Sequence, residues 1–164
     1  MLREHDPNDF LPKCVDVDYK PDATAPKWED WIRLVMEEPD PKDQADKIRF
    51  LQQAIGYSLT GFVSEQCVFF HFGHGGNGKS TFFEVLRRIL DDYVTNAEAT
   101  TFEQQKNDRI RADIARLRGA RLVTVSEGDR NSRVSEGLIK KVTSGEPVTV
   151  EFKHQNPFEF IPEF

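Results

Sequence analysis

Apolar residues recur at helical spacing in the first third of the chain. Spacings of three and four residues predict helices over residues 27–38 and 42–60, and two prolines close the first of them. The first 26 residues contain four prolines and several aspartates, which predict irregular, extended chain with a short strand near residues 15–19. The apolar stripes of both helices are typical of surfaces that pack against a core.

Further along, the apolar positions form short runs that alternate with amphipathic stretches. This alternation predicts an α/β arrangement of strands and helices. The last two strands are joined by a short polar connection, which favours a hairpin. The predicted strands are 67–72, 121–127, 148–152 and 158–161, and the predicted helices between them are 81–90, 108–117 and 134–143.

A glycine-rich run between the first of these strands and its helix carries the most specific chemistry. It fits the phosphate-binding pattern G-x-x-x-x-G-K-[ST] and lies between a predicted strand and a predicted helix, the context that this loop requires. Glycines allow backbone N–H groups to point at phosphate oxygens, and the helix N-terminus adds further donors. The predicted nucleotide-binding residues are Gly73, Gly75, Gly76, Asn77, Gly78, Lys79, Ser80 and Thr81.

Two side chains of this loop have predicted roles in phosphate chemistry. Lys79 is expected to reach the β- and γ-phosphates of ATP, and the Ser80 hydroxyl to complete the shell of a Mg²⁺ ion. A GTP-binding protein would need a base-reading N/T-K-x-D sequence, which the chain does not contain. A small-molecule kinase remains an alternative, although such enzymes have little use for a C-terminal hairpin.

Hydrolysis also needs an acid at the end of a neighbouring strand. The apolar run 122–125 is followed by Ser126 and Glu127, where the usual pattern has two acids. Glu127 is therefore the candidate that activates water, and Ser126 and Glu127 are candidates for the metal's water shell. Asp129 is a weaker candidate for the role of Glu127.

Composition limits the classes of protein that fit. The net charge is −6, which argues against a chain that is basic throughout, but residues 109–141 hold nine bases against four acids. That stretch is either a solvated face or a surface that meets phosphates. The two cysteines, Cys14 and Cys67, are far apart in sequence and suit a reducing compartment, with Cys67 expected in the core. Neither a membrane span nor a signal peptide is predicted.

Several segments together resemble superfamily 3 helicases, in the branch of phage and plasmid primase–helicases related to the poxvirus primase–helicase. The resemblance rests on residues 75–82 with Asn77 before the last glycine, on residues 117–127 with the Ser-Glu ending, and on residues 139–160. Residues 51–61 are similar to the helical segment that precedes the ATPase core. The resemblance covers nearly the whole chain, with three motifs in the expected order.

The resemblance implies a P-loop NTPase of AAA+-like type, with a three-layer αβα core around a parallel sheet. Residues 1–62 would form a small N-terminal extended and helical segment, and residues 63–164 a partial ATPase core. The family assembles rings, usually hexamers, that bind ATP and Mg²⁺ and translocate single-stranded DNA. Lys153 and His154 match the DNA-binding pair at the hairpin tip. A phage, prophage or plasmid origin, with action in the cytoplasm of a bacterial host, is also implied.

The chain departs from the family pattern in ways that affect the expected activity. The family continues into a strand with a sensor Asn and an arginine finger, and many relatives carry a primase domain upstream; none of these is present in the 164 residues. We therefore expect a truncated core that binds ATP better than it hydrolyses it. The alternative is an inactive ATPase remnant that binds DNA or a partner protein.

Overall fold

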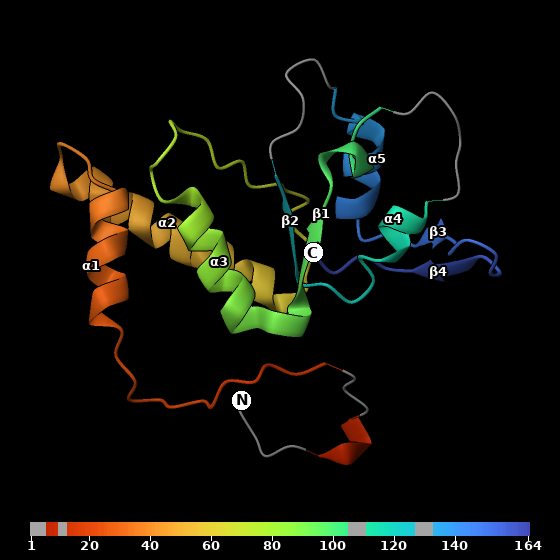
Figure 1. Cartoon of the computed structure of the whole chain (residues 1–164), viewed down its shortest axis with the longest axis horizontal. Helices are drawn as coiled ribbons and strands as arrows, with labels where there is room; N and C mark the ends of the chain where they lie inside the picture. Colours follow the sequence, from red (N-terminus) through yellow and green to blue (C-terminus); the bar gives the residue numbers. More distant parts are fainter. Residues whose placement is uncertain (1–5, 10–12, 105–110, 127–132) are drawn as a thin grey trace.

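The computed structural model describes residues 6–9, 13–104, 111–126 and 133–164. Its helices lie on both sides of a short parallel sheet, and a hairpin lies at the end of the molecule opposite α1 (Figure 1). The helices are α1 (Pro26–Val35), α2 (Pro41–Thr60), α3 (Lys79–Leu90), α4 (Ala112–Ala115) and α5 (Glu136–Thr143), with single 3-10 turns at η1 (Pro7–Asp9), η2 (Asp91–Tyr93) and η3 (Ala99–Thr101). The strands are β1 (Val94–Ala97), β2 (Leu122–Val125), β3 (Val148–Val150) and β4 (Phe158–Phe160).

Helices α1, α2 and α3 pack together on one side of the sheet. The Asp40 carboxylate caps α2 by accepting a hydrogen bond from the Lys42 backbone N–H at 2.8 Å, and Gly61 ends that helix with φ of 69°. The buried members of this first core, which we call the loop core, are Ile32, Leu51, Phe82 and Leu86. Residues from the predicted N-terminal segment and from the predicted ATPase core therefore share one apolar cluster.

The parallel pair β1 and β2 separates the loop core from a second core. Val94 pairs with Leu122 and Ala97 with Val125, and α4 lies in the crossover between the two strands. Leu122 packs against the loop core, whereas Val123 packs against the second core. Alternate residues of a strand point to opposite faces, so β2 has an apolar layer on each side.

The second core, which we call the hairpin core, joins α4, α5 and the antiparallel pair β3 and β4. Ile114 is 0% exposed and Leu117 1% exposed, and both belong to this cluster. Val148 and Val150 face it from β3, as their buried–exposed–buried alternation requires. The predictions of α2, α3 and a terminal hairpin are confirmed, with shifts of one or two residues at their ends.

The strand predicted at residues 67–72 is not formed. These residues make no ladder hydrogen bonds, and neither sheet of the described chain includes them. One face of the segment packs on helices: Phe69 meets Phe50 at 6.1 Å between ring centroids, and His71 meets Phe83 at 4.9 Å. The other face is open, with Phe72 92% exposed. An extended segment becomes a strand only with a neighbouring strand, and the described chain provides none there.

Other differences have local causes. The helix predicted at 108–117 is α-helical only in α4 among its described residues. After α4 the backbone continues in i to i+3 turns, in which the Leu117 N–H donates to the Ile114 carbonyl at 3.0 Å. Strand β1 was not predicted, since its sequence is polar and short. No strand forms near residues 15–19, and Cys67 is exposed rather than in the core.

Candidate nucleotide-binding site

The glycine loop turns directly into α3. Gly78 is the N-cap residue with φ of 89°, and its carbonyl accepts the first helical hydrogen bond from the Phe82 N–H at 2.9 Å. A left-handed φ of this kind suits glycine, and Gly76 has it too, with φ of 78°. No side chain caps the start of α3, and its first turn holds no acid. The positive end of the helix is therefore left for an anion.

The Lys79 ammonium is held inside the same loop. Its Nζ donates to the carbonyl oxygens of Gly73 at 2.9 Å and His74 at 3.2 Å, and to Asn77 Oδ1 at 2.8 Å. These three bonds use all three ammonium donors and keep the cation over the loop. The contacts are solvent-exposed, so phosphate oxygens can replace them at little cost in desolvation.

The remaining predicted residues of the loop start the helix. Ser80 and Thr81 lie in the first turn of α3 with exposed side chains, and Gly75, Gly76 and Asn77 form the turn before it. The donor set fits a nucleotide phosphate: one ammonium, two hydroxyls and an uncapped helix start. The described residues include no cluster of three or more His, Cys, Asp or Glu side chains that could hold a metal.

The proposed catalytic strand is only partly described. Ser126 follows β2 directly and is exposed, whereas Glu127 and Asp129 lie outside the described residues. Beside Ser126, the Thr124 hydroxyl donates to Asn96 Oδ1 across the sheet at 3.1 Å. This polar pair near the carboxyl ends of two parallel strands was not predicted. Thr124, an isolated polar position within the apolar run 122–125, was the signal that the sequence offered, whereas β1 itself is too polar to be recognised as a strand.

His71 lies two residues before the loop and packs against α3. Its ring meets Phe83 edge-on at 4.9 Å and Phe82 at 5.8 Å. The loss of water on this face lowers the pKa of His71 below its usual value, since the charged imidazolium is less well solvated there.

The lowered pKa of His71 predicts a pH dependence of stability. The unfolded chain takes up the proton at a higher pH than the folded chain, so stability should be full above the unfolded pKa and fall as pH drops through it, near about 6.5. Thermal melts between about pH 7.5 and 5.5 should show the wild-type chain losing stability relative to His71→Phe. Parallel pH curves for the two proteins would contradict this prediction. Both proteins contain the other histidines, so a difference between the two curves comes from His71.

The hairpin is a separate site on the far side of the sheet. Lys153 and His154 lie exposed in its turn, and the structure does not bring them to the glycine loop (Figure 1). His154 has φ of 67°, and the Gln155 N–H closes the turn on the Phe152 carbonyl at 3.0 Å. Phe152 stacks on Phe158 at 5.6 Å between centroids. The turn therefore projects beyond a stacked pair of aromatic rings.

The basic stretch 109–141 divides between structural and exposed positions. Arg118 lies over the Phe158 ring at 5.5 Å, Arg111 pairs with Asp113 at 3.1 Å, and Arg121 pairs with Glu163 at 3.6 Å. All three arginines make contacts within the fold, although Arg118 is exposed. Among the described residues of this stretch, the other exposed basic side chains are Arg116, Arg133, Lys140 and Lys141.

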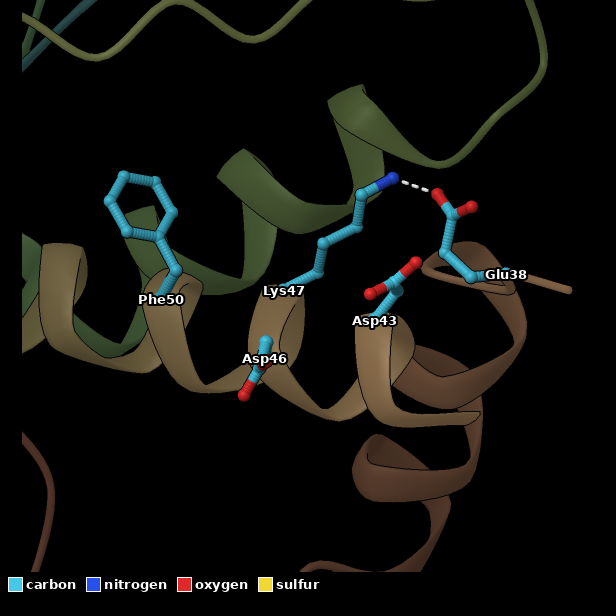
Figure 2. Close-up of a pocket in the computed structure, with 5 residues that line it drawn as sticks. All are labelled: Glu38, Asp43, Asp46, Lys47 and Phe50. Carbon is cyan, nitrogen blue, oxygen red and sulfur yellow. Dashed lines mark hydrogen bonds and ion pairs between the residues drawn. The ribbon is translucent and has the colours of Figure 1, made fainter. Parts of the chain in front are cut away.

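A pocket of about 410 Å³ lies on α2 and the connection between α1 and α2, and not at the glycine loop (Figure 2). Glu38, Asp43, Asp46, Lys47 and Phe50 line it, and the Lys47 ammonium is already paired with Glu38. Its excess of carboxylates makes it unsuited to phosphate. This pocket is therefore no candidate for a phosphate site.

The structure thus places a glycine loop at the start of a helix that packs on a parallel sheet. Residues 71–164 match the family described as "Family of unknown function (DUF5906)", and the chain belongs to that family. Residues 1–37 match a second family model, "D5 N terminal like".

A viral protein gives a further comparison. The protein named "Putative helicase L207/L206" of Acanthamoeba polyphaga mimivirus is 21% identical over 170 residues. The match takes in 100% of this chain but only 17% of that protein, so the chain spans about a sixth of the relative's length. Together the two kinds of match relate the chain to D5-like and helicase-named proteins. In the part of the chain that the structure describes, no helix is both long and apolar enough to cross a membrane.

Proposed function

We propose that this chain is the ATP-binding and ATP-hydrolysing core of a DNA replication primase–helicase. The observation that carries the proposal is the Lys79 ammonium, which is held over the uncapped start of α3. Gly78, the residue before Lys79, has a left-handed φ. That arrangement presents a cation and unpaired N–H donors to the same anion. The relationship to D5-like and helicase-named proteins supports the choice of helicase among P-loop enzymes.

The loop residues have separate tasks in this proposal. Lys79 exchanges its bonds to Gly73 and Asn77 for bonds to the β- and γ-phosphates of ATP. Ser80 and, through water, Ser126 hold Mg²⁺, which supplies positive charge against the phosphate oxygens. By its resemblance to the family motif, Glu127 accepts the proton of the attacking water.

The proposed partner of the hairpin is single-stranded DNA. Lys153 and His154 project a cation and a donor ring from a turn, which suits a phosphate contact that reads no base. In this proposal the AAA+-like cores assemble as a homo-hexameric ring and the hairpins grip DNA in its channel. A primase domain and other replication proteins are the further proposed partners, in a viral or plasmid replication system.

One observation favours a second candidate, a binding module without turnover. The segment 67–72 ahead of the glycine loop lacks strand partners among the described residues. A loop that is not anchored on a sheet can bind phosphate yet fail to hold the geometry that hydrolysis needs. Such a module would contact DNA or an intact helicase through its hairpin half.

The test is the ATPase rate with and without single-stranded DNA, over a range of protein concentrations, with Glu127→Gln as control. An assembling motor gives DNA-stimulated turnover that rises steeply with concentration and disappears in the variant. Mg²⁺-dependent ATP binding without turnover favours the binding module. Absence of ATP binding would overturn the proposal.

Lys153→Ala should weaken single-stranded DNA binding and flatten its salt dependence. A single lost phosphate contact reduces the slope of log K against log salt by about 0.7. Fluorescence anisotropy of a labelled oligonucleotide over a salt series measures that slope. Lys20→Ala is the control, because that exposed lysine lies in the N-terminal segment. An unchanged slope in Lys153→Ala would remove the hairpin tip from the DNA site.

A further inference from the structure

The first helix, α1, lies against Gly78 of the glycine loop. A Cβ built on Gly78 would lie 2.9 Å from Trp31 Cζ2 and 2.9 Å from Val35 Cγ1. Real Cβ atoms essentially never make contacts that short. Helix α1 therefore leaves no room for a side chain at position 78, and only glycine fits there. Gly78 needs its left-handed φ of 89° for α3 to start where it does.

Stacked rings fix the position of Trp31. Trp31 stacks on Trp28 at 5.2 Å between centroids, and Trp28 stacks on Phe82 at 5.9 Å. Phe82 is a buried residue of α3, one turn after Gly78. The aromatic row therefore ties α1 to the same helix whose N-terminus faces the phosphates.

The contact also joins the two segments that the family comparisons distinguish. Helix α1 lies within the D5-like match of residues 1–37, and the glycine loop lies within the match of residues 71–164. Both α1 and α3 lie on the same side of the β1–β2 sheet (Figure 1). The D5-like segment is thus placed against the loop of the neighbouring matched segment.

We propose that Trp31 and Val35 are positioning residues that lock Gly78 and hold the phosphate loop in its binding conformation. Glycine visits positive and negative φ about equally, so the loop alone would spread over several conformations. Affinity falls in proportion to the fraction of molecules in the competent conformation. The inference rests on the proposed nucleotide-binding function of the loop, and it adds α1 to that site.

Trp31→Ala should weaken binding of ATP and of inorganic tripolyphosphate by the same factor, about tenfold if the competent fraction falls to about a tenth. Equal factors are expected because the loop contacts phosphates and not the base. Trp31→Phe should restore most of the affinity, since a ring still covers Gly78. Leu34→Ala is the matched control, because Leu34 is 68% exposed on the same helix. Unchanged affinity in a folded Trp31→Ala would overturn the proposal.

Amide hydrogen exchange without nucleotide keeps the proposal testable if Trp31→Ala loosens α1 as a whole or if no nucleotide binds. Residues 76–82 should exchange faster in Trp31→Ala and in the smaller truncation Val35→Ala, but not in Leu34→Ala. Exchange that is unchanged at the loop contradicts the locking role. If residues 76–82 exchange faster in Trp31→Ala but the wild-type chain binds no ATP, the nucleotide-binding function is rejected and the locking role of Trp31 is retained.

Discussion

Lys79→Ala should abolish measurable ATP binding. In the proposed site the ammonium makes charge-assisted hydrogen bonds to phosphate, each worth about 1.5–3 kcal/mol, so the loss of two of them would weaken affinity by at least about a hundredfold. Isothermal titration with Mg²⁺ and ATP measures the loss. The fold should survive, because the Gly73 and His74 carbonyls and Asn77 Oδ1 are exposed and can accept from water instead.

Lys42→Ala is the matched control for this prediction. Lys42 is an exposed lysine near the start of α2, so its loss changes the net charge equally without touching the loop. A thermal melt of each variant separates lost binding from lost folding. Normal ATP affinity in a folded Lys79→Ala would show that the glycine loop is not the nucleotide site.

The glycine loop could be predicted because its structure is local. Gly76 and Gly78 have left-handed φ and α3 starts directly after them, and these features depend only on neighbours within a few residues. The segment 67–72 looked equally clear, yet it has no strand ladder. Its pattern describes which residues can be buried, whereas a strand also needs a partner from elsewhere in the chain.

Contacts between distant residues could not be predicted from spacing. The helical stripe of α1 indicated an apolar face, but only the structure shows that Trp31 covers Gly78. Strand β1 was not predicted because two of its residues, Thr95 and Asn96, are polar. Its extended conformation is set by pairing with β2, which spacing along the sequence does not reveal. The predicted acid Glu127 lies outside the described residues, so its role stays a prediction.

Ile114→Ala should give the largest loss of stability. Ile114 is 0% exposed in the hairpin core, and removing such a side chain costs about 2–5 kcal/mol through lost burial and the cavity that remains. For a chain of this size, each 1 kcal/mol lowers the melting temperature by about 2–4 °C. We therefore expect a drop of roughly 5–20 °C by circular dichroism. Ile89→Ala, at a position 47% exposed on α3, should change it little.

The same variant tests whether the two cores fold as one unit. Leu122 and Val123 are adjacent on β2 and pack on opposite cores, so damage to the hairpin core is expected to reach the loop core through one short strand. Both tryptophans of the chain, Trp28 and Trp31, pack against the loop core. In Ile114→Ala, their fluorescence should therefore report the same lowered midpoint as circular dichroism. A tryptophan transition that stays at the wild-type midpoint would show that the loop core is stable without the hairpin core.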